Sequence, residues 1–456
     1  MGTPGELYAK NLILNWMQEI GLENITQERI TGPWTRQDTW ENLRNALLDP
    51  SYYPDAWIGD LDLKKNHTKW YLNIKVYDKK NNLVDSKYFS QSQCFPFLKS
   101  EFGFGSHNTS IKDVLVSDRF LIGRPHIVLM EADWRDPYMW WLNNRSKLRR
   151  PSVKGFILMD CHDDTIFMMG SGTSTSYLLQ RFEEAGISIN GSSGKWIKKY
   201  LHDSNYVVKA DLCSEWEWEK VESYNLIGEI PGKSDKIAII NAFYDGWWNQ
   251  ATSDVATSVG AILGLAKYIK DNGIVPELTL KFIFWGSHEW FFHGAKHYIK
   301  THEIKKYGTR YASDNVDKED ILYVISPGNF GFNYTNDMQF NVGHPRDKDL
   351  QAFMQNVASG LQYTKRTKIG LSGDYYAYGL ESFVFYHGHR YPERYCKHAI
   401  EFDRWPYPGY HRDGANHTKG DVFSEINDTL YRVDCEVVSE ICLRSVSYTH
   451  LRAHET

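Results

Sequence analysis

The chain has 456 residues, of which 42% are hydrophobic, 24% charged and 15% aromatic. This composition is typical of a globular protein with sizeable cores, and it excludes an intrinsically disordered chain. The 52 basic and 57 acidic residues give a net charge of -5, so we expect no nucleic-acid partner. No uninterrupted apolar run of about 18 residues occurs, which predicts that no segment spans a membrane.

The two ends of the chain and its cysteines bear on where the protein works. Residues 1–6 have neither the basic nor the apolar region of a signal peptide, so the predicted location is cytoplasmic by default. Residues 446–456 resemble the translation of a transposase sequencing adapter, so we exclude them and leave both natural termini open. The six cysteines include no CxxC pair, which predicts buried free thiols.

The first half of the chain predicts a helix, a hairpin and a strand-rich region. Apolar residues over 6–25 follow one helical face, and polar and apolar residues alternate over 69–90 on either side of a polar turn. We therefore expect a region 1–109 whose helix and hairpin pack partly on the second half, followed by a β-rich domain at 110–215. The strands expected in that domain lie at residues 125–130 and 154–159.

From residue 223 the pattern changes to alternating strands and helices. Residues 236–243 form a continuous apolar run, as a buried parallel strand does, and a helix is expected over 254–271 with Ser253 or Asp254 as its N-cap. Further strands are expected at 278–285, 321–325 and 382–386, and further helices at 349–358 and 429–443. This alternation predicts an α/β domain over 223–445, with a mostly parallel central sheet and helices on both faces.

Polar residues follow the predicted strands, where such sheets bind their ligands. Asp245 and Asp254 follow the first strand, His288 and Glu289 follow the second, and His417 comes late in the chain. Carboxylate and imidazole donors from separate segments suit a divalent metal such as zinc. Each residue is also compatible with a structural role, Asp254 as a helix cap and His417 as a hydrogen-bonded loop residue.

Five segments, in their order and spacing, resemble the zinc aminopeptidase family, family twenty-eight of the metallopeptidases. They are Asn225–Gly232, Ala242–Asp245, Asp254–Ser258, Phe282–Glu289 and His417–Asp421. The family includes bacterial leucine aminopeptidases, glutamate carboxypeptidase, glutaminyl cyclase and the transferrin receptor. The resemblance covers roughly 223–443, and residues 110–215 resemble more weakly the protease-associated domain often inserted ahead of this catalytic domain.

The resemblance implies metal-ligand roles for three residues: Asp254 as the bridging aspartate, Glu289 and His417. Asp245 matches the aspartate that orients the family's first histidine ligand, but that histidine is replaced by Phe243. The glutamate that acts as general base is replaced by His288, so the active site is degenerate.

Two further family positions also differ. The late aspartate ligand falls on Gly328, or on Asn329 if the register slips by one, and the tyrosine before the last histidine is Asn416. One metal position therefore keeps only Asp254, and we expect it to be empty. The other keeps all three ligands, so we expect one zinc ion, as in the glutaminyl cyclases of this family.

The resemblance leaves functions of different kinds open. The first is a mononuclear zinc hydrolase or acyltransferase acting on a peptide or aminoacyl substrate, with His288 as the base, since an ordinary imidazole pKa of about 6.5 suits proton transfer. The second is a catalytically inactive pseudo-peptidase that serves as a binding or scaffold protein. A third is a dinuclear peptidase that draws its missing ligands from His387, His389 or His411. The oligomeric state stays open.

Overall fold

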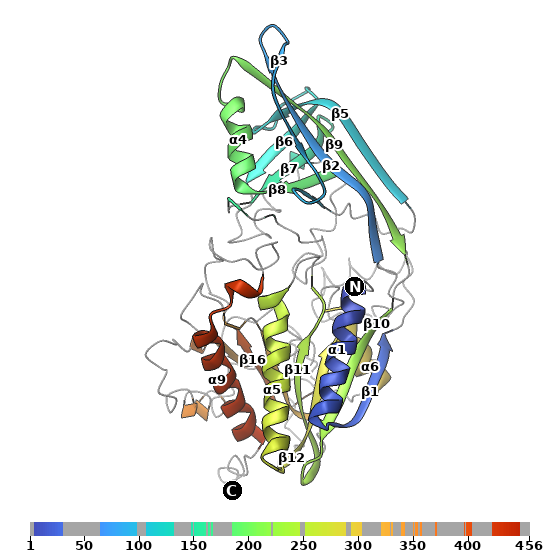
Figure 1. Cartoon of the computed structure of the whole chain (residues 1–456), viewed down its shortest axis with the longest axis vertical. Helices are drawn as coiled ribbons and strands as arrows, with labels where there is room; N and C mark the ends of the chain where they lie inside the picture. The colour runs from blue at the N-terminus through green and yellow to red at the C-terminus, as the bar shows by residue number, and fades with distance from the viewer. Residues whose placement is uncertain are drawn as a thin grey trace, which may run out of the picture.

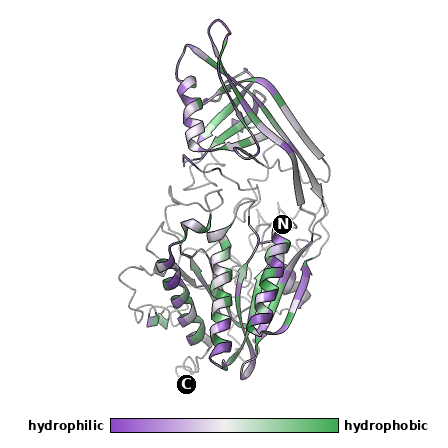
Figure 2. Cartoon of the chain, in the orientation of Figure 1, coloured by the Kyte–Doolittle hydropathy of each residue, from purple (hydrophilic) through white to green (hydrophobic). Residues whose placement is uncertain are grey.

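The computed structural model consists of two bodies, each built on its own β-sheet (Figure 1). It describes residues 4–30, 64–97, 106–131, 147–148, 150–160, 163–164, 166, 185–219, 222–246, 251–288, 293–302, 321–328, 330–331, 339–342, 350, 352–353, 356–357, 370–371, 396, 398–403 and 422–446. Hydrophobic residues run along strands of both sheets, and the helices of the lower body carry both apolar and polar residues (Figure 2).

The first body has a mixed sheet with a parallel centre. In the described residues its strands follow the order β1-β10-β12-β11-β13-β16-β14-β15. Their bounds are β1 Glu23–Ile30, β10 Ser223–Ile230, β11 Ser234–Phe243, β12 Leu278–Trp285, β13 Ile321–Pro327, β14 Gln339–Val342, β15 Gly370–Leu371 and β16 His398–Asp403. β12, β11, β13 and β16 run parallel to one another, and β10 and β14 flank them antiparallel. The predicted α/β class and mostly parallel central sheet are confirmed.

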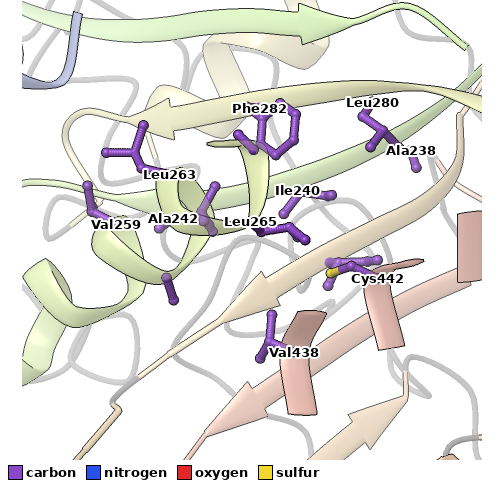
Figure 3. Packing of buried hydrophobic residues seen from close by; sticks show 14 of the residues in the cluster. Ala238, Ile240, Ala242, Val259, Leu263, Leu265, Leu280, Phe282, Val438 and Cys442 are labelled. Carbon is purple, nitrogen blue, oxygen red and sulfur yellow. The ribbon is translucent and has the colours of Figure 1, made fainter. Parts of the chain in front are cut away.

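Helices cover both faces of this sheet, as predicted. Three lie on one face, α1 (Pro4–Ile20), α5 (Thr257–Asp271) and α9 (Asp428–Val446), and together they share a core with alternate residues of β11 and β12. Figure 3 shows this packing, with Ile240, Leu263 and Val438 brought together from β11, α5 and α9. The opposite core includes residues of α6 (His293–Thr301) packed on the other side chains of the same strands. A parallel strand buried on both faces explains the continuous apolar run of β11.

Two predicted helices differ in the structure. The helix expected over 6–25 ends at Ile20, because Gly21 adopts a positive φ of 79°, and the chain then enters β1. The helix expected over 254–271 begins with a π-helical turn, η3 (Thr252–Ala256), so neither Ser253 nor Asp254 is its N-cap. Ala251, with a φ of 46°, holds that position. The described residues of the helix expected at 349–358 are helical, and the strand expected at 382–386 lies outside the described residues.

The second body carries a sheet of strand order β3-β2-β9-β5-β6-β7-β8-β4 in the described residues. Its elements are β2 Lys64–Asp78, β3 Leu83–Phe89, β4 Phe95–Phe97, β5 Ser106–Ser117, β6 His126–Glu131, β7 Val153–Met159, β8 Ala185–Ile189, α4 Gly191–Leu201 and β9 Tyr206–Glu219. β2 and β3 are the predicted hairpin, and β6 and β7 match the strands expected at 125–130 and 154–159. This sheet thus takes its hairpin from before residue 110 and its remaining long strands from about 106–219. The protease-associated character of this body stays a prediction.

The remaining expectations concern thiols and membranes. Of the described cysteines, all are free, and Cys94, Cys213, Cys396 and Cys442 are buried. Cys435 is half-buried, and burial raises its pKa to about 11. No described helix is long and apolar enough to cross a membrane.

Candidate functional site

The candidate site begins where β11 and β12 end side by side. The last residues of the two strands, Phe243 and Trp285, are paired in parallel register. The amide of Tyr244 donates to the carbonyl of Trp285 at 3.1 Å, which continues the pairing by one residue. The segments that follow the two strands therefore leave the sheet together, and this brings Asp245 and His288 into contact.

Asp245 holds the backbone of His288. Its Oδ1 accepts a hydrogen bond from the His288 amide at 2.9 Å, and the Asp245 side chain is buried. A buried carboxylate that accepts an amide hydrogen at this distance restrains the turn after β12. The resemblance implies that this aspartate orients a histidine two residues before it, a position that Phe243 occupies here, and the structure pairs Asp245 with His288 at the expected base position.

Phe243 lies flat against the imidazole of His288. The two ring centroids are 3.5 Å apart and the ring planes differ by 5°. Phe243 is buried and His288 is half-buried. The side chain that replaces the first histidine ligand is therefore in direct contact with the side chain that replaces the general base. A stacked ring covers a face of the imidazole, while the ring nitrogens lie in its plane.

A second carboxyl group, that of Glu6, lies near Asp245. Burial first, and then the nearby carboxylate of Glu6, raise the pKa of Asp245 to about 6, against the opposing effect of His288. Glu6 comes from α1 and accepts a hydrogen bond from the Ser223 hydroxyl at 2.5 Å. The neighbouring Tyr244 donates its hydroxyl to the carbonyl of Tyr224 at 2.7 Å, and its pKa is raised by burial, Glu6 and Asp245. Sequence reasoning missed Glu6, since its signal was only that of an acidic residue in a helical first turn.

Ser287 occupies a strained position next to His288. Its φ is 60°, in the left-handed region that residues with side chains rarely adopt. Its hydroxyl is buried and has no hydrogen-bond partner within the described part of the chain. Strained backbone of this kind occurs often at functional sites, which agrees with the position of Ser287 at the end of β12.

The start of α5 forms another side of the region. The backbone of Asp254 lies within η3, where the amide of Thr257 donates to the carbonyl of Thr252, five residues back. Single π-helical turns are frequent at functional sites. The hydroxyl of Ser258 donates to the carbonyl of Gly328, and the amide of Gly328 donates to the carbonyl of Phe402 at 2.6 Å. Gly328, one of the two residues expected at the position of the late aspartate, thus joins α5 and β16 through its backbone.

The predicted metal ligands themselves are not described in full. Of Asp254 only the backbone lies within the described residues. The other candidates lie outside them, namely Glu289, His417, Asn329, Asn416, His387, His389 and His411. Among the described side chains, no group of three or more histidines, cysteines, aspartates or glutamates is arranged to hold a metal. The three ligand assignments, and the catalytic roles of His288 and Asp245, stay predictions.

Comparisons with known proteins agree with the fold. Residues 225–441 match the model of peptidase family M28. The fold is similar to a zinc aminopeptidase from Bacillus subtilis, at 12% identity and a TM-score of 0.59 over 98% of this chain and 90% of that one. It is also similar to a peptidase M28 precursor from Shewanella amazonensis SB2B, at 15% identity and a TM-score of 0.61 over 98% and 89% of the two chains. The fold is similar as well to an aminopeptidase from Aneurinibacillus sp. strain AM-1, at 14% identity and a TM-score of 0.52 over 97% of this chain and 89% of that one. No curated protein matches the chain in sequence.

Proposed function

The chain contains a peptidase family M28 domain in residues 225–441, and from this premise we propose that it is a mononuclear zinc hydrolase acting on peptide-like substrates. The peptidase-like hydrolase character follows from the family. The single zinc, its ligands and the substrate class are the proposal. Two carboxylates and one imidazole, from Asp254, Glu289 and His417, are donors that suit a catalytic zinc with an open position.

The observation that carries the proposal is the contact between Phe243 and His288. A hydrocarbon ring stands where a second metal would need a ligand, and it lies against the imidazole at 3.5 Å. Gly328, which with Asn329 is one of the two residues expected at another ligand position of that second metal, offers only backbone atoms, and these bond to Ser258 and Phe402. Both features support one metal rather than two.

The chain's own residues then define the chemistry. Zinc in such a shell supplies Lewis acidity toward a peptide carbonyl. The ring nitrogens of His288 lie in the ring plane, and an imidazole nitrogen accepts a proton from an attacking water and returns it to the leaving amine. Phe243 fixes the plane of the ring, and Asp245 fixes the backbone that carries it, at 2.9 Å. Both restraints favour a single orientation of the base.

The same contact also favours a second candidate, a catalytically inactive pseudo-peptidase that binds a partner. A face of His288 is covered by Phe243, so the imidazole also has a packing role that does not depend on turnover. In that case the domain keeps its fold without turnover.

Metal content separates the candidates. We expect about one zinc per chain in protein purified without a histidine tag, measured by elemental mass spectrometry after dialysis against trace zinc. The variant Asp254→Ala is expected to lose it. About two zinc ions would mean a dinuclear site and would overturn the mononuclear proposal, and no zinc would leave the pseudo-peptidase.

Activity decides whether the metal is catalytic. Aminoacyl and glutaminyl substrates are the first to assay, and His288→Ala is expected to lower turnover about 10²–10⁴-fold while zinc content is unchanged. A variant with full turnover would contradict the role of His288. Zinc binding without turnover of either substrate class in the wild type would favour a metal-stabilised binding protein.

A further inference from the structure

The two ends of the segment that carries His288, Gly286 and Gly294, lie close together against β10. It leaves β12 at Gly286 and enters α6 near Gly294. A Cβ added at Gly294 would lie 2.4 Å from the carbonyl oxygen of Gly286, so the two ends of the segment touch. A Cβ added at Gly286 would lie 2.3 Å from the Ser223 hydroxyl and 2.6 Å from the carbonyl of Tyr224. The two ends of the segment, Gly286 and Gly294, therefore meet against the first residues of β10.

Asn225 links Gly294 to strand β1 through hydrogen bonds of its side chain. Its side chain is fully buried, and its Nδ2 donates to the carbonyl of Gly294 at 2.9 Å and to Glu28 Oε2 at 3.1 Å. One amide group thus bonds the first turn of α6 and a carboxylate on the neighbouring strand β1. Both bonds are made to groups on elements that meet only in the tertiary structure.

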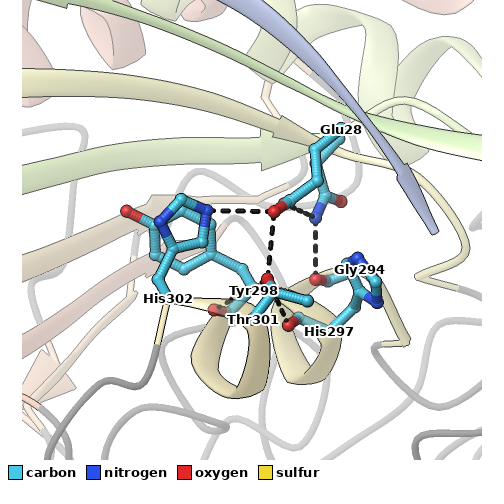
Figure 4. A network of polar contacts seen from close by, with 7 residues as sticks. Glu28, Gly294, His297, Tyr298, Thr301 and His302 are labelled. Carbon is cyan, nitrogen blue, oxygen red and sulfur yellow. Dashed lines mark hydrogen bonds and ion pairs between the residues drawn. The ribbon is translucent and has the colours of Figure 1, made fainter. Parts of the chain in front are cut away.

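Glu28 extends the link to the other end of α6 (Figure 4). Its Oε1 lies 2.9 Å from His302 Nε2 and 3.0 Å from the hydroxyl of Thr301, which is also 2.9 Å from the carbonyl of His297. Asn225 and Glu28 therefore hold α6 at its first turn and just after its last. A helix fixed at both ends resists a shift along β10.

We propose that Asn225 and Glu28 are positioning residues for the segment between β12 and α6, and through it for His288 and the adjoining Glu289. The inference rests on the proposed function, in which these two residues serve as base and zinc ligand. Asp245 holds the segment from the side of β11 at 2.9 Å, and the Asn225–Glu28 pair holds it from the side of β10 and β1. Partners that orient metal ligands from outside the shell commonly change metal affinity about 10–100-fold when removed.

The first test replaces the buried amide by an isosteric carboxylate. In Asn225→Asp the donor to Gly294 is lost and the new charge faces Glu28, so we expect zinc affinity to fall about tenfold or more in competition with a chromophoric chelator. The matched control is Asn73→Asp. The amide of Asn73 also donates to a carboxylate, that of Asp211 at 3.2 Å, but Asn73 belongs to β2 in the sheet of the second body. We expect the control to change affinity less than about threefold, and equal effects in the two variants would overturn the proposal.

A rescue separates positioning from general damage. The amide introduced by Glu28→Gln can donate to the carboxylate introduced by Asn225→Asp, so the double variant reverses the direction of the hydrogen bond and removes the charge repulsion. We expect it to recover part of the lost zinc affinity, and a double variant weaker than Asn225→Asp would contradict the link. Glu28→Ala, at a partly exposed side chain, serves if Asn225→Asp does not fold.

Hydrogen exchange tests the same proposal without zinc. In the metal-free protein we expect the amides of residues 286–294 to exchange about tenfold faster in Asn225→Asp, while those of α5 are unchanged. If the wild type binds no zinc, the proposed function fails and this measurement alone judges the positioning role. Unchanged exchange at 286–294 would overturn it.

Discussion

At the scale of single residues, the contacts of His288 decide what the site can do. Its amide donates to Asp245, its ring lies on Phe243, and the preceding residue, Ser287, has a φ of 60°. Three separate restraints thus act on one short stretch of chain. An imidazole with so little freedom is preorganised for a single task, and whether that task is catalysis or packing depends on what its ring nitrogens meet.

The stacking of Phe243 on His288 predicts a measurable coupling energy. In a double-mutant cycle of Phe243→Leu and His288→Ala we expect a coupling of about 0.5–1.5 kcal/mol in the free energy of unfolding, because stacked rings contribute about that much beyond burial. Denaturant unfolding of the four proteins measures it. The matched control is Phe282→Leu with His288→Ala, since Phe282 is equally buried but lies in the core on the other face of the sheet. A coupling as small as in this control would mean that the stack adds no stability.

At the scale of elements, the long strands of the second body carry a polar ladder on the face away from their core. Leu72, Ile74 and Val76 of β2 are buried, and the residues between them face outward. There Asp211 of β9 accepts hydrogen bonds from Lys75 Nζ at 2.7 Å, Asn73 Nδ2 at 3.2 Å and the amide of Asp113 at 2.8 Å. The ladder fixes the register of β2, β9 and β5 where apolar contacts do not.

This ladder predicts acid sensitivity. Partial burial acts to raise the pKa of Asp211, but the hydrogen bonds from Lys75, the Asp113 amide and Asn73 outweigh it, and the pKa is lowered. A carboxylate with a lowered folded-state pKa contributes stability that is fully present above its unfolded pKa of about 3.9. That stability is lost as the pH falls through the folded pKa.

The variant Asp211→Asn checks the sign. We expect it to cost about 1–2 kcal/mol at pH 7, and the difference from wild type to shrink as the pH falls below about 4, in thermal unfolding from pH 3 to 7. The control is Asp113→Asn on the same face, whose ion pair with Lys209 at 2.7 Å is more exposed and worth little. A constant difference at every pH would show that Asp211 acts through its shape and not its charge.

At the scale of the whole molecule, each sheet has its own core. The two clusters around β11 and β12 take their residues from the first body, and the cluster around β2, β7 and α4 takes its residues from the second. None of these clusters combines described residues of both bodies. Bodies with separate cores generally unfold as separate units.

We therefore expect two unfolding transitions in calorimetry, and we expect zinc to raise the Tm of only one of them. At a concentration about 100 times its dissociation constant, zinc adds about 2.7 kcal/mol to the body that binds it, or roughly 5–10 °C in Tm. Asp254→Ala is expected to abolish this shift and to leave the other transition in place. A single transition that moves as a whole with zinc would contradict independent cores.

Many strands of this protein, and its α/β class, are determined by local patterns in the sequence. The alternation of β2 and β3, the continuous apolar run of β11, and β12 with bounds equal to those expected follow from side-chain periodicity, which is a property of neighbours in the chain. The α/β class follows from the order of such elements. The placement of Asp245 and His288 at one edge of the sheet follows from the same order, because the carboxyl ends of parallel strands coincide.

Other features were decided only by the tertiary structure. Glu6 reaches the vicinity of Asp245 from 239 positions earlier in the chain, and Asn225 meets Glu28 and Gly294 because three elements converge. The π-helical turn at Thr252–Ala256 replaced the expected N-cap, and Phe243, expected only as a lost ligand, became the contact of His288. Each of these depends on packing between residues distant in sequence, and neither periodicity nor motif spacing reports such contacts.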